Sequence, residues 1–202
     1  MPNGDVREWD RRAVLGSLPP SVDLDAETLR LPTPCAGWDL AALLRHMIAQ
    51  HRGFAAAARG NGADPMVWEL RPLGSDARAD YQAAADDVVA AFAEPGALER
   101  QLSLPELSPT VQFAGATAIG FHLLDYVAHG WDVARTVGVD YAMDDVVLAA
   151  TWQVASQIPG TASSAESGTP FGVPATVTAT APLIDRIVGR LGRSPDWTVT
   201  TA

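Results

Sequence analysis

Lysine is absent from the 202-residue sequence, in which all 14 basic residues are arginine. This absence excludes Schiff-base catalysis, the attachment of pyridoxal phosphate and the lysine of a phosphate-binding loop. Cysteine is nearly absent too, since Cys35 is the single one. One cysteine cannot form an internal disulfide, which fits a reducing compartment.

Positive charge and long apolar runs are also scarce. The chain carries 24 acidic and 14 basic residues, for a formal charge of −10. Because nucleic-acid binding depends on clustered positive charge, we expect no nucleic-acid partner. No apolar run approaches the roughly 18 residues that span a bilayer, and the first residues lack the pattern of a signal peptide. We therefore expect a cytoplasmic protein that does not associate with membranes.

Apolar residues, by contrast, make up 48% of the chain, which is enough for the core of a single domain over residues 1–202. Their spacing predicts several helices, joined by long proline-containing connections. A short hairpin is possible within residues 96–113. We predict an all-α fold: a four-helix bundle over about residues 5–158, whose long connections permit a crossover, and a short helical and extended appendage over about 159–202. The predicted helices cover residues 5–17, 39–58, 76–93, 114–136, 143–158 and 182–191, with a mobile loop at 160–172 and an extended segment at 173–181.

The segment FHLLDYVAHGWD, residues 121–132, holds the most informative polar residues. Asp125 and His129 lie four residues apart and share one helix face. They stand among apolar residues, and a buried polar group needs a partner, of which a divalent metal is one. His46 lies beside the apolar stripe of the helix over 39–58 and is a candidate third ligand from a facing helix.

Two histidines and one carboxylate with an open position suit a catalytic zinc site, and equally ferrous iron or nickel. The alternative is that Asp125 and His129 simply hydrogen-bond each other within the helix.

Several segments also resemble a known family. PTPCAGWD at residues 32–39, LLRH at 43–46 and DYVAHGWDVAR at 125–135 resemble the actinobacterial branch of the DinB/YfiT-like superfamily. This branch is similar to the N-terminal domain of mycothiol-dependent maleylpyruvate isomerase. The resemblance runs from about residue 9 to 195 and includes the tail segments 171–174 and 182–193.

The resemblance implies a DinB-like four-helix bundle with a crossover and a divalent metal, often zinc or nickel, held by three ligands. The matching positions are His46, Asp125 and His129, and relatives often carry Glu or His in place of Asp125. Because aspartate is the shorter acid, His122 is an alternative ligand. Tyr126 and Arg45 are candidates for lining the same site.

Related members act through low-molecular-weight thiols, chiefly mycothiol or bacillithiol. The resemblance therefore implies a metal-dependent thiol S-transferase or isomerase that acts on a small electrophile, as a monomer or a homodimer. One alternative is a metal-binding or small-ligand-binding bundle without catalysis. Another is a structural or regulatory bundle whose histidines form hydrogen bonds in the core.

Other polar and aromatic residues near these motifs have simpler interpretations. We expect Cys35 to be a small buried packing residue rather than a nucleophile, and His51 to be solvated. Trp38 and Trp131 are interpreted as core or cap packing residues, with pocket-lining aromatics as the alternative. Asp132 is expected to form a salt bridge at the helix end with Arg135, or else to hydrogen-bond a ligand histidine.

Overall fold

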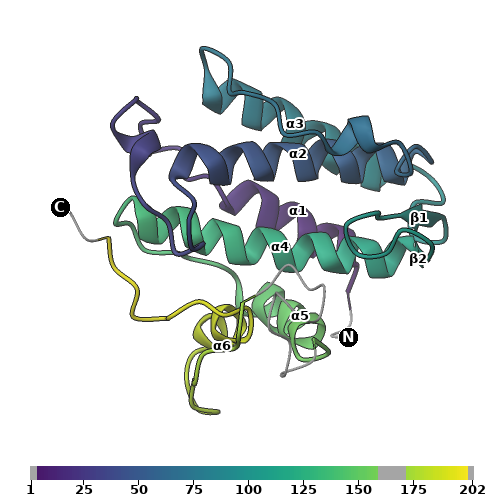
Figure 1. Cartoon of the computed structure of the whole chain (residues 1–202). Coiled ribbons are helices and arrows are strands. Elements are labelled where there is room, and N and C mark those ends of the chain that lie inside the picture. The colour runs from purple at the N-terminus through teal and green to yellow at the C-terminus, as the bar shows by residue number, and fades with distance from the viewer. Residues whose placement is uncertain (1–3, 159–171, 200–202) are drawn as a thin grey trace.

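The computed structural model describes residues 4–158 and 172–199 (Figure 1). Within these residues the fold contains six α-helices, two short 3₁₀ helices and one two-stranded hairpin, which confirms the all-α prediction. The mobile loop expected at 160–172 lies outside the described residues except for its last one, and residues 173–181 form no strand. The elements are α1 (Val6–Gly16), η1 (Thr28–Arg30), α2 (Leu40–Ala58), η2 (Pro65–Trp68), α3 (Ala77–Ala93), β1 (Gln101–Ser103), β2 (Gln112–Ala114), α4 (Gly115–Thr136), α5 (Asp145–Ala155) and α6 (Leu183–Arg190).

Aspartates fix where three of the bundle helices begin. The side chains of Asp5, Asp39 and Asp76 each accept a hydrogen bond from a backbone N–H in the first turn of α1, α2 and α3. Those N–H groups have no partner within the helix, so each cap contributes about 1 kcal/mol.

Four helix contacts form a closed ring: α1 packs on α4, α4 on α2, α2 on α3, and α3 on α1. The chain therefore runs from α1 to α2, and later from α3 to α4, between helices that lie diagonally in the bundle. Residues 17–39 and 94–114 make these two long connections, which is the crossover arrangement (Figure 1). α5 packs on α4 and α1, and α6 packs on α5, away from α2 and α3.

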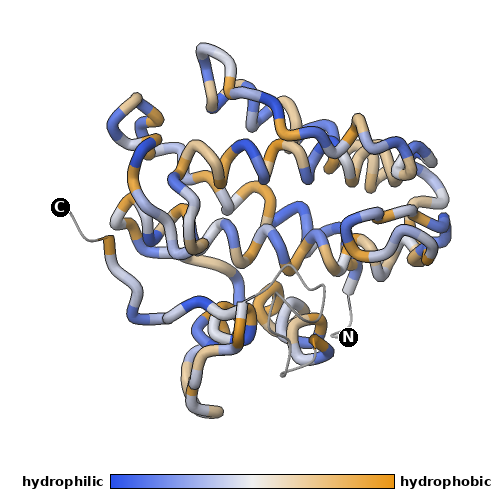
Figure 2. Tube along the Cα trace, viewed as in Figure 1, coloured by the Kyte–Doolittle hydropathy of each residue, from blue (hydrophilic) through white to orange (hydrophobic). Residues whose placement is uncertain are grey.

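α4 lies at the centre of this arrangement and is buried on almost every side. It contacts α1, α2, α5 and the hairpin, and a helix in that position needs apolar residues all around. Polar residues nonetheless interrupt it, and Figure 2 shows hydrophilic stretches in the middle of both α2 and α4. These polar residues form two separate clusters inside the bundle.

The hairpin is short, with Leu102 opposite Phe113 in the register of β1 and β2. Its connecting loop, residues 104–111, borders a cavity that is also lined by residues of α2 and α4. Among the described residues, no helix is long and apolar enough to cross a membrane.

Candidate metal centre

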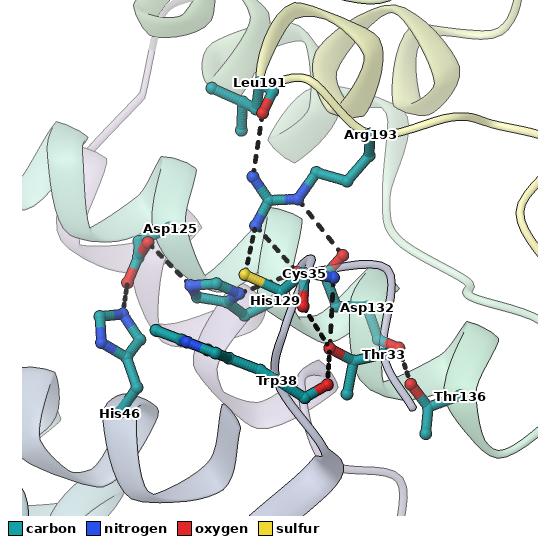
Figure 3. Close-up of polar contacts among 10 residues, drawn as sticks. All are labelled: Thr33, Cys35, Trp38, His46, Asp125, His129, Asp132, Thr136, Leu191 and Arg193. Carbon is teal, nitrogen blue, oxygen red and sulfur yellow. Dashed lines mark hydrogen bonds and ion pairs between the residues drawn. The ribbon is translucent and has the colours of Figure 1, made fainter. Parts of the chain in front are cut away.

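Three side chains predicted as ligands converge between α2 and α4. His46 comes from α2, and Asp125 and His129 come from successive turns of α4 (Figure 3). The His129 Nε2 atom lies 3.2 Å from Asp125 Oδ1, and the His46 Nε2 atom lies 3.9 Å from Asp125 Oδ2. One ligand atom from each of the three residues lies within 4.8 Å of the others. We call these residues the open cluster.

The spacing of the three donor atoms suits a small divalent ion. Metal–ligand bonds of 2.0–2.2 Å in a tetrahedral site separate the ligand atoms by about 3.3–3.6 Å. The His129–Asp125 separation of 3.2 Å, to Oδ1, and the His46–Asp125 separation of 3.9 Å, to Oδ2, fall on either side of that interval, each through a different carboxylate oxygen. Asp125 therefore reaches far enough to join both histidines, despite its short side chain.

The second ring nitrogen of His129 is held by a buried carboxylate. Nδ1 of His129 lies 2.9 Å from Oδ2 of Asp132, which is fully buried. Arg193 donates to both carboxylate oxygens of Asp132, from Nη2 at 2.9 Å and from Nε at 3.3 Å (Figure 3). A carboxylate in this position fixes the ring orientation and directs Nε2 toward Asp125, where a metal ion could replace the Nε2 proton. Of the two interpretations of Asp132, the helix-end salt bridge with Arg135 is therefore wrong.

The end of α6 aims Arg193 at Asp132. The backbone N–H groups of Gly192 and Arg193 donate to the carbonyls of Gly189 and Val188, at 3.1 and 3.0 Å, and Gly192 has φ +86°. This pattern is a Schellman cap, in which glycine takes the left-handed conformation. It turns the chain back toward the bundle, so that Arg193 lies 7% exposed against α4. Nothing in the local sequence around residue 193 indicated this contact.

Opposing charges set the protonation of the open cluster. Burial disfavours the charged form of His129, but Asp125 and Asp132 outweigh it and raise the His129 pKa to about 9. Burial lowers the pKa of His46 to about 4, against the attraction of Asp125. Burial would raise the pKa of Asp125, yet His129 and His46 hold it well below its usual range. At neutral pH the cluster thus holds an ionised Asp125, a protonated His129 and a neutral His46.

The open cluster borders a cavity of about 400 Å³ between α2, α4 and the connecting segments that cover them. His46 and Asp125 have 21% of their side-chain surface exposed there. Most of the lining is apolar. The other lining residues are Cys35, Trp38, Gln50, Phe54, Trp68, Leu70, Leu104, Glu106, Leu107, Phe121 and Arg193.

The loop before α2 brings two of these residues to the cavity. Thr33 accepts a hydrogen bond from Cys35 N–H at 3.2 Å, and its own N–H donates to the Trp38 carbonyl at 3.1 Å, which closes a tight turn. Trp38 lies 4.9 Å from the His46 ring, so it lines the cavity and is not simply a packing residue. Trp131 is 2% exposed, in line with the packing interpretation. Cys35 is half-buried, and burial raises its pKa to about 11 despite the nearby Arg193.

A second polar cluster, formed by Asp10, His51 and His122, lies in the core away from this cavity. His122 Nδ1 lies 2.6 Å from Asp10 Oδ1, and its Nε2 lies 3.2 Å from His51 Nδ1. His51 and His122 are 0% exposed and Asp10 is 1% exposed. We call these residues the closed cluster.

The closed cluster overturns two expectations from the sequence. His122 uses both ring nitrogens within this cluster, so it is not available to replace Asp125 as a ligand. The prediction that His51 is solvated is wrong, because α2 packs against both α3 and α4 and buries more than one side. Tyr126 stacks on His51 at 3.9 Å and donates to the Met47 carbonyl, so it belongs to the core and not to the cavity.

The two other arginines considered from the sequence also lie outside the cavity. Arg45 donates to the Arg71 carbonyl at 3.2 Å and does not line the cavity. Arg135 is exposed, lies over the Trp131 ring and donates to the Pro195 carbonyl at 3.0 Å. The arginine at the cavity is Arg193 instead.

A ring of four helices with diagonal connections, and a histidine–carboxylate–histidine cluster beside a cavity, define a DinB-like bundle with a candidate divalent-metal site. The model of the family described as the mycothiol maleylpyruvate isomerase N-terminal domain matches residues 22–134, and the chain belongs to this family. The matched range includes His46, Asp125, His129 and Asp132 and ends before Arg193.

Two relatives match most of the chain. They are uncharacterized proteins of Mycobacterium tuberculosis, from strains CDC 1551 / Oshkosh and ATCC 25618 / H37Rv. Each is 26% identical over 174 residues, which is 84% of this chain and 87% of the relative. No solved structure matches the chain.

Proposed function

We propose that the protein binds one divalent metal ion through His46, Asp125 and His129 and uses it, with a low-molecular-weight thiol of the mycothiol type, to transfer that thiol to a small electrophile or to isomerise one. The observation that carries the proposal is the convergence of the three donor atoms at a cavity, with His129 oriented by Asp132. Two imidazoles and one carboxylate favour zinc, with nickel or iron as alternatives.

A divalent ion in this site would hold a bound thiol as the thiolate at neutral pH. The protein's own residues orient and shield the reactants. Asp132 and Arg193 keep the His129 ring in place, and the apolar walls keep water away from the reacting groups. We do not assign Cys35 as the nucleophile, because burial raises its pKa to about 11 and so favours the thiol over the thiolate.

The proposal separates into two measurable parts. Metal analysis of protein expressed in metal-replete medium should find close to one ion per chain, and the ion should be absent from the His46→Ala variant. Arg45→Ala is the matched control, since Arg45 is the neighbouring residue on α2 and lies outside the cavity. No bound ion in the parent protein, or equal metal content in His46→Ala, would refute metal binding.

The second measurement tests catalysis. The metal-loaded protein is incubated with mycothiol and monochlorobimane, and conjugation is followed by fluorescence. A rate above that of the chelator-treated protein supports thiol transfer. A protein that holds its metal but gives no added rate with this electrophile, or with those named below, is a metal-binding bundle without this activity.

A further inference from the structure

Within the described residues, the cavity beside the open cluster has no unpaired cationic side chain that could bind an anionic electrophile. Among the described residues that line it, the cationic groups at neutral pH are Arg193 and His129, and the two ring nitrogens of His129 face Asp125 and Asp132. The Arg193 guanidinium is also occupied. It donates to both oxygens of Asp132 and, from Nη1 at 3.2 Å, to the Leu191 carbonyl. An anion entering the cavity would have to compete with a buried carboxylate for this one group.

The apolar part of the cavity extends away from the ligands along α2 and α4. From His46 it passes Gln50 to Phe54, eight residues along α2, which spans about 12 Å at 1.5 Å per residue. Phe121 lies on the facing wall, one turn before Asp125 on α4. This length accommodates a ring system in addition to a reactive carbon near the ligands.

The aromatic part of the wall is fixed by packing. Trp68 donates from Nε1 to the Gly62 carbonyl at 2.8 Å and meets Phe54 edge to face at 5.5 Å. A Cβ atom on Gly53 would lie 2.1 Å from the Trp68 ring, so glycine at this position lets the indole lie against α2. The cavity therefore presents a preformed aromatic surface, as binding sites for small apolar ligands do.

The far end of the cavity carries negative charge. Glu106, in the loop between β1 and β2, lines it and accepts a hydrogen bond from the Gln50 amide at 2.9 Å. A carboxylate on the electrophile would face Glu106 there, whereas the cations of the described lining, Arg193 and His129, lie together at the ligand end and are paired with Asp132 and Asp125 (Figure 3).

We infer that the electrophile is an uncharged compound that carries an aromatic ring, with the ring against Phe54, Trp68 and Phe121 and the reactive carbon toward the open cluster. This inference rests on the proposed thiol transfer.

For a benzylic chloride, the thiol sulfur forms a bond to the benzylic carbon and the carbon–chlorine bond breaks. Chloride leaves with the electron pair, and the proton of the thiol passes to solvent.

Two electrophiles of similar shape test the charge preference. 4-Nitrobenzyl chloride is neutral and 4-(chloromethyl)benzoate is anionic, and each rate is divided by its rate without enzyme. We expect the neutral compound to be favoured by about tenfold, the size expected for like charges several ångströms apart. Glu106→Gln should remove most of this preference, whereas Glu99→Gln, an exposed acid outside the cavity, should keep it.

A binding measurement separates this inference from the proposed catalysis. In metal-free protein without thiol, 4-nitrotoluene should quench tryptophan fluorescence, and Trp68→Phe should reduce the quenching. Neutral 4-methylbenzamide should displace it at a concentration about tenfold lower than anionic 4-methylbenzoate does.

Selective binding without turnover would remove the thiol-transfer proposal and leave standing only the preference of the cavity for an uncharged aromatic ligand. Turnover with no preference, or with a preference for the anion, would overturn the inference and leave thiol transfer intact. The absence of saturable binding by either neutral compound would also overturn it.

Discussion

The bundle contains two clusters of histidine and aspartate, and the same pair of helices supplies the histidines of both, while Asp10 of the closed cluster comes from α1. α2 carries His46 and His51, and α4 carries His122 and His129. In the closed cluster, His122 lies between Asp10 and His51 and the protein supplies its hydrogen bonds. In the open cluster the ring nitrogen of His46 and a carboxylate oxygen of Asp125 are 3.9 Å apart and border a cavity.

The difference lies in where the donor atoms point, not in the residue types. A histidine whose two nitrogens are occupied inside the core stabilises the fold and has no free lone pair for a ligand. In the open cluster Asp132 occupies one nitrogen of His129, and the other faces Asp125 and the cavity. Substitutions in one cluster should therefore leave the properties of the other unchanged.

Removing one histidine of α4 from each cluster should give opposite effects on metal binding. His129→Ala should lower the affinity for zinc by more than about 100-fold, because it removes a ligand and not merely a group that orients one. His122→Ala should leave the zinc stoichiometry of the folded protein unchanged. Competition with a chromophoric chelator measures both, and equal losses in the two variants would contradict the distinction.

The effects on the free energy of unfolding should follow the opposite order, with the larger loss in the closed cluster. His122→Ala leaves Asp10 buried without its partner and should lower the free energy of unfolding by about 3–5 kcal/mol. His46→Ala, which is partly exposed and whose ring forms no short hydrogen bond, should cost less than about 1 kcal/mol in metal-free protein. Urea unfolding in the presence of chelator tests this, and similar losses in both variants would show that the clusters share one structural role.

Substitution of Asp132 should change metal binding at the open cluster and leave the closed cluster unchanged. Asp132→Asn weakens the support of His129 and should reduce zinc affinity by about 10–100-fold. Arg135→Gln is the matched control, since Arg135 follows on the same helix, is exposed and points away from the cavity. An unchanged affinity in Asp132→Asn would mean that the buried carboxylate serves packing only.

Metal binding should depend on pH through His129. The pKa of His129 in the metal-free protein is raised to about 9, so below that pH a metal ion must displace its proton. Zinc affinity should therefore rise by about tenfold per pH unit between pH 6 and 9 and level off above it. His46, with its pKa lowered to about 4, should add a second proton only in more acidic solution.

The raised pKa of His129 also makes the stability of the metal-free protein depend on pH. The pKa of His129 is higher in the folded chain than its ordinary value of 6.5, so its contribution to stability is fully present below that pH and is lost as the pH rises through about 9. Isothermal titration calorimetry of zinc binding, in buffers of different ionisation enthalpy, measures the proton that His129 releases when zinc binds. A zinc affinity that is flat between pH 6 and 9 would contradict the assignment of His129 as a ligand.

The smallest effect is expected at Cys35. The thiol lines the cavity but stays protonated, because burial raises its pKa to about 11. Cys35→Ser should therefore change zinc affinity and conjugation rate by no more than about twofold. A loss of most activity in this variant, with metal retained, would make Cys35 part of the chemistry of the open cluster.

Local sequence pattern was sufficient to predict the helices and the pair Asp125–His129, because both depend on spacing along one helix. The third residue of the open cluster, His46, was accessible because its helix also showed a clear apolar stripe. The family resemblance strengthened that grouping.

What the sequence could not indicate depends on contacts between distant segments. Arg193 reaches Asp132 only through the turn at Gly192, and His51 is buried only because α2 packs on two helices. The aromatic wall was missed for the same reason: Phe54 and Trp68 meet across a loop whose path has no periodic pattern.

Metal binding at the open cluster is tested most directly by a crystal structure of the zinc-loaded protein, with anomalous diffraction recorded at the zinc edge. We expect one strong anomalous peak, about 2.0–2.2 Å from His46 Nε2, an Asp125 carboxylate oxygen and His129 Nε2, and none beside Asp10, His51 and His122. A peak at the closed cluster, or the absence of a peak at the open cluster in protein shown to contain zinc, would contradict this expectation.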